Sequence, residues 1–492
     1  MQAKMKSWFF TLYFAFFLIF TACEPEPSFN SQETLYLVAM AQLAAENSCT
    51  GSNEFWARNL ISGASSYCVK ASLVGESTNI KLYLEDGLTT TMDYSAIVTA
   101  FESNIHPTSV DAFGSASDIN NDGKITVLIL DIRDGATSSS GFVAGFVDPI
   151  NFFADSTAIS VRSNQMEILY MDGNELDTLR QKELASGLPD TFLSTLAHEL
   201  QHLIRYPNQD TSSADLTWID EGTSEVASDI TGYGPQTSRM ECFRGASTSS
   251  CSGGVNGTSL ISWSNSLTDY SFAYAFMKYL YQISGSSNTQ RNAFLKSTVA
   301  GSVRANTTSA LMSAFAQSSG YNSSILPSDQ TLLFKYLFTS FMGQAVNYTD
   351  FSTVYIGSTS ATDLSNVKSN YPLPSDLNDI RSFSAATQQS SVSLTPGQTY
   401  RFSGSTSGVS SGSNGVILAS GSSEYIIFNG NINGSSAEAI TSASFYGLQK
   451  FPKLNIEHNH NKHIICPQET LRSIHNIQNS QYNLKRYYAW QE

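Results

Sequence analysis

Charged side chains are scarce in this sequence, and basic ones are the scarcest. Charged residues make up 14% of the 492 residues, and 42 acidic against 27 basic residues give a net charge of −15. Clusters of Lys and Arg that would neutralise a phosphate backbone are few, so we expect no nucleic-acid partner. Ser, Thr, Asn and Gly take the place of charge, which suits an exported protein.

Long apolar runs are almost absent as well. The run from Trp8 to Phe20 is too short to span a bilayer, and it lies between two lysines and the small residues before Cys23. This is the pattern of a signal peptide over residues 1–22, and its end resembles a bacterial lipobox. We therefore predict lipidation of Cys23, a tether over residues 23–33, and a lipid-anchored protein of the bacterial cell envelope that faces the periplasm or the exterior. A plain cleaved signal with a structural Cys23 is the alternative.

Cysteine is also rare, with six residues at positions 23, 49, 68, 242, 251 and 466. In an oxidising compartment, Cys49 with Cys68 and Cys242 with Cys251 are the economical disulfides. Cys466 is then left over. The alternative is that some of these thiols stay reduced.

Only seven histidines occur, and two of them carry the strongest signal in the chain. His198, Glu199 and His202 form the pattern H-E-x-x-H. On an α-helix, residues four apart lie about 6 Å from each other on one face, so both imidazoles can reach one cation. Glu199 then lies beside a water held by that cation. The pattern predicts a zinc-peptidase centre with Glu199 as the general base.

A catalytic zinc needs a third protein ligand and one position open to water. The continuation H-E-x-x-H-x-x-G-x-x-H would require Gly at 205 and His at 208, where the chain has Arg205 and Asn208. That class is excluded. Glu221, with eighteen residues between it and His202, is the predicted third ligand. Glu225, one turn later, is predicted to hydrogen-bond a ligand histidine, with a solvated helix residue as the alternative.

The segments around these residues resemble the hyicolysin-type family of neutral zinc metallopeptidases, which belongs to the glutamate-ligand zincins. The similar segments are HELQH at 198–202, WIDEG at 218–222 and SNQMEILYMD at 163–172, and the likeness extends from about residue 113 to about Leu280. The resemblance implies zinc on His198, His202 and Glu221, with Glu199 catalytic. Asp220 stands where such motifs usually have Asn.

Two further parts of a peptidase site are predicted, each with an alternative. Residues 160–172 have the composition of a strand placed just before the active-site helix, and an edge strand there would bind an extended peptide by strand addition. A plain core strand is the alternative. Tyr270 is the candidate donor to the oxyanion, with Tyr274 behind it, although the chain has 23 tyrosines to choose from.

Residues 118–123 open like a calcium-binding loop. Asp118, Asn120 and Asp122 place oxygens at alternate positions, and Gly123 suits the sharp turn before a strand over 125–132. Ile129 stands where a closing acid should be. We predict a possible Ca²⁺ site on these three residues, with an Asx-rich turn as the alternative.

The fold class predicted from these patterns is α+β, a zincin catalytic domain joined to a small C-terminal β-sandwich-like module. The catalytic domain would contain a twisted sheet with an edge strand, the H-E-x-x-H helix and a mainly helical C-terminal subdomain. Helices are expected at 32–46, 93–105, 309–318 and 332–342, and a hairpin over 67–86. The predicted boundaries are an N-terminal α+β unit at 34–110, the metallopeptidase domain at 111–355, a linker at 356–384, the β module at 385–448 and an atypical, disordered tail at 449–492.

Three function classes remain open at this point. The first is a zinc endopeptidase that hydrolyses extracellular proteins, binds protein or peptide substrates and acts as a monomer. The second is a zinc aminopeptidase, for which Glu167 would offer an acidic pocket to the substrate amine. The third is a surface adhesin with an idle protease domain, which the intact predicted metal set argues against. His458, His460 and His463 in the tail are a weaker metal candidate.

Overall fold

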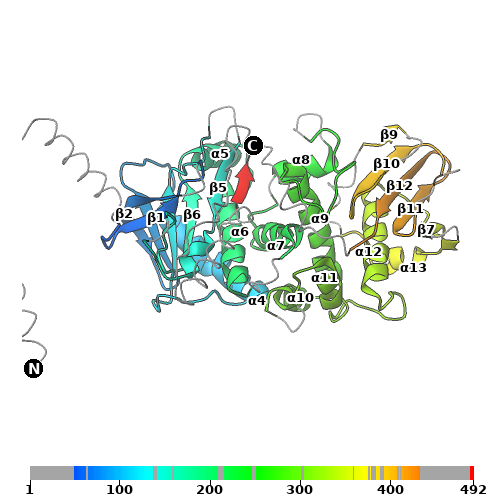
Figure 1. The fold of residues 1–492 in the computed structure, drawn as a ribbon, viewed down its shortest axis with the longest axis horizontal. Helices are drawn as coiled ribbons and strands as arrows, with labels where there is room; N and C mark the ends of the chain where they lie inside the picture. The colour runs from blue at the N-terminus through cyan, green and yellow to red at the C-terminus, as the bar shows by residue number, and fades with distance from the viewer. Residues whose placement is uncertain are drawn as a thin grey trace, which may run out of the picture. The chain divides into compact units, whose positions relative to one another are not determined.

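The computed structural model describes residues 49–432 and the backbone of 488–491, apart from 62–64, 137–140, 158–159, 209–214, 236, 246–250, 301–303, 358–359, 375–376, 378–383, 388–392, 407–408 and 410–411. The chain divides into two compact units, Met1–Gly51 and Ser52–Glu492, and the described strands and helices belong to the second (Figure 1). Cys23, Cys466, the predicted helix at 32–46 and the three tail histidines lie outside the described residues.

The first sheet has seven strands in the order β1-β2-β3-β4-β6-β5-β13. The hairpin predicted over 67–86 is present, because β2 and β3 pair antiparallel with a register shift between Leu73 and Gly75. β3, β4 and β6 are parallel neighbours, so strands from both sides of residue 110 share one sheet. The strands are β1 Glu54–Arg58, β2 Ser66–Glu76, β3 Ile80–Glu85, β4 Ile125–Leu130, β5 Phe142–Phe146, β6 Ile168–Asp172 and β13 Tyr488–Gln491.

The prediction of an edge strand over 160–172 is wrong. Only Ile168–Asp172 is a strand, and β6 lies between β4 and β5, paired with both. It pairs with β4 over its whole length and with β5 at Tyr170 and Met171, so β6 is an interior strand of the sheet. The residues before it are held in another way, since the Asn164 side chain accepts from the backbone N–H of Trp56 at 2.8 Å and donates to its carbonyl at 2.8 Å.

The helices follow the apolar spacing of the sequence. Asp93 accepts from the backbone N–H of Ala96 and begins α3, and the predicted helical stretch to Ile105 continues as a π-helical turn into α4. No helix among the described residues is long and apolar enough to cross a membrane. The helical elements are α3 Tyr94–Ala100, η1 Phe101–Ile105, α4 His106–Phe113, η2 Pro149–Phe152, α5 Glu175–Ala185, α6 Thr191–Arg205, η3 Tyr206–Asn208, α7 Thr217–Ile230, α8 Thr237–Arg244, α9 Leu267–Ile283, α10 Asn288–Ala300, α11 Thr308–Phe315, α12 Gln330–Ala345 and α13 Ser365–Asn370.

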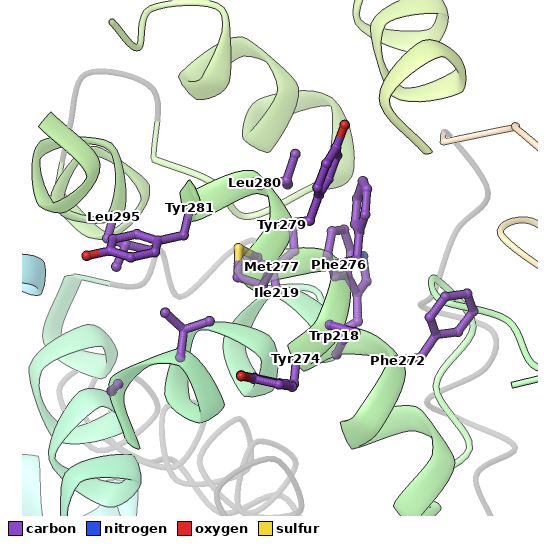
Figure 2. Close-up of a cluster of buried hydrophobic side chains, with 14 of the residues drawn as sticks. Trp218, Ile219, Phe272, Tyr274, Phe276, Met277, Tyr279, Leu280, Tyr281 and Leu295 are labelled. Carbon is purple, nitrogen blue, oxygen red and sulfur yellow. The ribbon is translucent and has the colours of Figure 1, made fainter. Parts of the chain in front are cut away.

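The two helices α7 and α9 pack closely and form the centre of the largest apolar core (Figure 2). Trp218 of α7 and Phe276 of α9 have ring centroids 6.1 Å apart and are both 0% exposed. Gly222 makes this approach possible, because a Cβ there would lie 3.0 Å from the carbonyl oxygen of Ala273. A larger residue at 222 would push α7 away from α9 and move its neighbour Glu221.

The second sheet has six strands in the order β8-β7-β11-β12-β10-β9. The described residues place no second sheet against it, so the prediction of a β-sandwich is wrong for this part of the chain. Helix α12 covers one face instead, where Phe338 and Phe428 have ring centroids 4.7 Å apart. A helix thus buries one apolar face of this sheet. The side chains that alternate with it form a second, smaller buried cluster of Phe402, Ile417, Tyr425 and Ile427. The strands are β7 Val354–Ile356, β8 Ala361–Thr362, β9 Ala386–Thr387, β10 Thr399–Ser403, β11 Gly415–Ser420 and β12 Glu424–Asn429.

Candidate metal centre

Helix α6 carries both histidines of the H-E-x-x-H pattern. Asp190 caps its first turn by accepting from the backbone N–H groups of Phe192 and Leu193. All of its residues from Thr191 to Arg205 are buried, because α6 contacts β5 and β6 as well as α7. The face that carries the two histidines is buried against polar and charged groups of α7.

The predicted third ligand meets the two histidines. The Nε2 atoms of His198 and His202 lie 3.2 Å apart. Glu221 Oε2, from α7, lies 3.3 Å from His198 Nε2 and 3.5 Å from His202 Nε2. A tetrahedral ion with ligand bonds of about 2.0–2.1 Å places its ligand atoms about 3.3–3.4 Å apart. The triangle of donor atoms therefore has the size that a tetrahedral metal ion requires.

Two carboxylates at this position are buried. Glu199 and Glu221 are 0% and 1% exposed, and among the residues that the structure describes neither oxygen of either side chain has a hydrogen-bond partner. Burying an ionised carboxylate without compensation costs several kcal/mol or more, so such a group needs a cation or a proton. Gly145 of β5 leaves room for Glu199, since a Cβ there would lie 3.1 Å from Glu199 Cγ.

Negative charge is in excess around the two histidines. Five buried carboxylates, Glu199, Asp215, Asp220, Glu221 and Glu225, share this region with three arginines, Arg205, Arg239 and Arg304. With neutral histidines and ionised carboxylates, two negative charges are left over. One divalent cation would neutralise them.

Burial also controls the protonation of the metal-free site. Burial lowers the pKa of His198 to about 3, despite the opposing effect of Glu225. Burial raises the pKa of Glu221 to about 7 and raises that of Glu199 well above its usual value. The pKa of His202 is raised well above its usual value, because Asp220 and Glu221 together outweigh its burial.

Each ligand histidine has a carboxylate behind it. Glu225 is 0% exposed, which excludes the solvated alternative. Its Oε1 lies 3.7 Å from His198 Nδ1, which is too far for the predicted hydrogen bond, and His198 Nδ1 has no hydrogen-bond partner among the described residues. Arg239 Nε donates to the same oxygen at 2.8 Å. On the other side, His202 Nδ1 lies 3.2 Å from Asp220 Oδ1 and 3.2 Å from Ser224 Oγ.

The two candidate oxyanion donors, Tyr270 and Tyr274, have different surroundings. Tyr270 is 1% exposed, and the Arg239 guanidinium lies 4.8 Å from the centre of its ring. Burial raises the pKa of Tyr270 well above its usual value, and the nearby Glu221 raises it further. The Tyr274 hydroxyl donates to Asp229 Oδ2 at 3.0 Å (the side chain of Tyr274 is labelled in Figure 2).

The loop at 118–123 uses its oxygens in another way. Asp118 Oδ1 accepts from the backbone N–H groups of Asp122 and Gly123 at 3.0 and 3.1 Å. Asp122 accepts from the backbone N–H of Lys124 and pairs with the Lys81 ammonium, both at 2.9 Å. The Asx-rich turn therefore describes this loop, and a Ca²⁺ site is unsupported. A cation there would have to displace Lys81.

Three other sequence candidates have defined surroundings. Glu167 accepts from the Ser117 hydroxyl and, at 3.0 Å, from the backbone N–H of Ile119, so it anchors the loop before β4. Cys242 and Cys251 form a disulfide with a Cα–Cα distance of 4.8 Å. The Cys49–Cys68 pair stays a prediction. Its two cysteines belong to different compact units, Met1–Gly51 and Ser52–Glu492.

The comparison with known proteins gives one partial match. The chain is 27% identical over 219 residues to the neutral metalloprotease ShpI of Staphylococcus hyicus, which covers 42% of this chain and 45% of that protein. The chain thus matches about half the length of this curated relative. No protein-family model matches the sequence. The match supports a metal-dependent peptidase at the level of general class.

Sequence reasoning missed most of the charged groups behind the ligands. The extra charge of Asp220 was visible because it precedes Glu221 directly, and the contact of Asp220 with His202 explains its position. Arg239 lies fourteen residues after Glu225 with no recognisable spacing, and Arg304 lies 89 residues after its partner Asp215. Only the tertiary fold brings these pairs together.

Proposed function

We propose that this protein is a zinc-dependent endopeptidase of the zincin type, similar to the hyicolysin-type peptidases, that hydrolyses peptide bonds in extracellular proteins. The observation that carries the proposal is the triangle formed by His198 Nε2, His202 Nε2 and Glu221 Oε2, with sides of 3.2, 3.3 and 3.5 Å. The partial similarity to a neutral metalloprotease supports the same class.

The residues present fit zinc, which would be held by His198, His202 and Glu221. Bound there, zinc would polarise the scissile carbonyl and make a water acidic enough to attack it near neutral pH. Glu199, whose oxygens have no hydrogen-bond partner within the described ranges, accepts the proton of the attacking water and passes it to the leaving amine. Burial raises the pKa of Glu199 in the metal-free site, and a cation bound beside it would lower that pKa and leave the carboxylate ionised, as a base requires.

Tyr270 is proposed to stabilise the negative oxygen of the tetrahedral intermediate by donating its hydroxyl proton in a hydrogen bond. The raised pKa keeps this hydroxyl protonated across the physiological range, and the carboxylates that raise it include Glu221 and Glu199. Asp220 orients the ring of His202 and holds it in the tautomer that presents Nε2 to the metal. Glu225, whose Oε1 lies 3.7 Å from His198 Nδ1, places a negative charge behind that ring.

Among the alternatives, an endopeptidase is favoured over an aminopeptidase by the surroundings of Glu167. An aminopeptidase needs a carboxylate that is available to the substrate amine. Glu167 is 1% exposed and is already bound by Ser117 and Ile119. An idle adhesin would not need the complete set of three ligands and a base.

The purified protein should cleave unfolded casein at internal bonds, and a zinc chelator should abolish the cleavage. Readdition of zinc should restore it. Release of single N-terminal residues without internal cuts would indicate the aminopeptidase. Binding of one zinc per chain without any cleavage would indicate the adhesin and contradict the proposal.

Export and lipid anchoring are proposed from the sequence pattern alone. We infer that Cys23 is the lipidated first residue of the mature chain and that the peptidase acts as a monomer at the cell envelope. Metabolic labelling with a clickable palmitate analogue should mark the protein, and Cys23→Ser should abolish the label. Labelling that persists in Cys23→Ser would contradict the anchor.

A further inference from the structure

Behind His202 lies a buried row of charged groups that the proposed reaction does not use. His202 Nδ1 lies 3.2 Å from Asp220 Oδ1, which in turn lies 3.5 Å from Arg205 Nε. Arg205 Nε also donates to Asp215 Oδ2 at 2.8 Å. Asp215 Oδ1 accepts from Arg304 Nη2. The row therefore runs without a break from the second histidine to the segment before α11.

The row is shielded from water along most of its length. Arg205, Asp215 and Asp220 are 0% exposed, and the Arg304 side chain is 15% exposed. Buried charges persist only where each one faces an opposite charge in good geometry. Because the interactions between such groups are stronger in the interior than in water, each member restricts the orientation of the next.

The same row fastens two helices to one segment, residues 304–308. The end of α6 carries His202, and the second turn of α7 carries Glu221, so the distance between these helices sets the size of the donor triangle. Residues 304–308 bind both helices. The bonds are Arg205 Nη2 to Ala305 O at 2.8 Å, Leu216 N to Asn306 O at 2.9 Å and Trp218 Nε1 to Thr308 Oγ1 at 3.3 Å.

We propose that Arg205 and Arg304 are positioning residues of the metal centre. Through Asp215 and Asp220 they fix the ring of His202 and hold α6 and α7 at the spacing that the three ligands need. The proposal rests on the proposed function only in requiring a metal ion on those ligands. It also gives a reason for Arg205, which occupies the position of the glycine in the excluded H-E-x-x-H-x-x-G-x-x-H class.

Three variants test the row at increasing distance from the metal. Asp220→Asn keeps the shape and one acceptor oxygen but removes the charge beside His202. Arg205→Lys keeps the charge but cannot bond Asp215 and Ala305 with one planar group. Arg304→Gln changes the partly exposed end of the row, where misfolding is the smallest concern.

The measurements are the zinc affinity, from competition with a chromophoric chelator, and the visible spectrum of the cobalt-substituted full-length protein. We expect Asp220→Asn and Arg205→Lys to bind zinc about 10- to 100-fold more weakly, the loss known for groups that orient metal ligands. Arg304→Gln should weaken binding less, by about threefold to tenfold on the same scale. The cobalt spectrum should change in all three, because it reports the ligand geometry.

The matched control is Asp148→Asn. Arg58 and Asp148 form another buried pair at 3.0 Å, with side chains 0% and 3% exposed, that touches neither ligand histidine. The variant Asp148→Asn should leave the zinc affinity and the cobalt spectrum unchanged. If Arg205→Lys and Arg304→Gln fold and match Asp148→Asn in both readouts, the positioning role is overturned, while the proposed function still stands. Wild-type protein that binds zinc tightly but cleaves no protein would count against the proposed function alone.

Discussion

Two regions of the chain match short metal-binding patterns, the H-E-x-x-H helix with Glu221 and the loop at 118–123. In the first, the oxygens of Glu199 and Glu221 are buried and have no hydrogen-bond partner in the described part of the chain. In the second, Asp118 and Asp122 accept backbone N–H groups, and Asp122 pairs with Lys81. Both regions present acidic oxygens at motif spacing. What separates a metal centre from a turn is whether the fold supplies those oxygens with other partners.

The largest effect that separates the two regions is expected from His202→Ala. Loss of a ligand should remove the metal and with it both activation of the water and its attack on the carbonyl, so activity should fall by on the order of 1,000-fold or more. Hydrolysis of an internally quenched peptide and the zinc content of the same sample measure this. In the loop, Asp122→Ala should leave peptide hydrolysis and zinc content within about twofold of the wild-type values, as expected for a surface substitution. Equal losses of activity and zinc in His202→Ala and Asp122→Ala would contradict the assignment of the metal to the helix rather than the loop.

A second prediction separates the two tyrosines of α9. Tyr270→Phe should lower kcat about 100-fold with little change in KM or zinc content, because a donor to the oxyanion acts in the transition state. Tyr274→Phe is the matched control, since its hydroxyl donates to Asp229. If Tyr270→Phe and Tyr274→Phe have the same kcat, Tyr270 is not the oxyanion donor.

The third prediction concerns pH. In the metal-free protein the pKa of Glu221 is about 7, above its ordinary value, so a proton competes with the metal at lower pH. Apparent zinc affinity should therefore rise by about tenfold or more per pH unit between pH 5 and 7. It should go on rising above pH 7, because His202, whose pKa is also raised well above its usual value, must lose its proton to bind the metal. His198, with a pKa of about 3, adds no competition in this range. Chelator competition at four pH values measures the slope, and a flat profile would contradict the assignment.

The smallest effect is expected from calcium. Because the oxygens of the 118–123 loop are already bound, millimolar Ca²⁺ should leave the midpoint of thermal unfolding unchanged within about 1 °C, equivalent to a few tenths of a kcal/mol. The loop variant Asp122→Asn loses a partly exposed ion pair with Lys81 and should cost about 0–1 kcal/mol. A calcium-dependent rise of several degrees that Asp122→Asn abolishes would show that the loop is a cation site after all.

The sequence predicted the local parts of this molecule better than the parts formed by distant segments. H-E-x-x-H spacing places two histidines on one helical face whatever surrounds the helix, and Glu221 lies on the next helix of the site. The partners Arg239 and Arg304 depend on where α8 and the segment before α11 pack, which spacing does not encode. These arginines therefore became visible only in the folded chain.

The errors in the fold have the same origin. The sequence predicted a strand at Ile168–Asp172 but not its place in the sheet. Its neighbours there are β4 and β5, and β5 was not predicted from the sequence. The apolar alternation after residue 390 predicted strands correctly, since β10, β11 and β12 are present. It could not show that α12, rather than another sheet, covers one of their faces.

The central claim is that three converging ligands hold a metal for which Glu199 serves as the base, and Glu199→Gln tests it most directly. The variant keeps the shape of the side chain and all three ligands but cannot accept a proton. We predict one zinc per chain in both proteins, with casein cleavage reduced by about 10²- to 10⁴-fold in Glu199→Gln, the contribution typical of a general base. Glu199→Gln that binds zinc and cleaves casein at the wild-type rate would contradict the account.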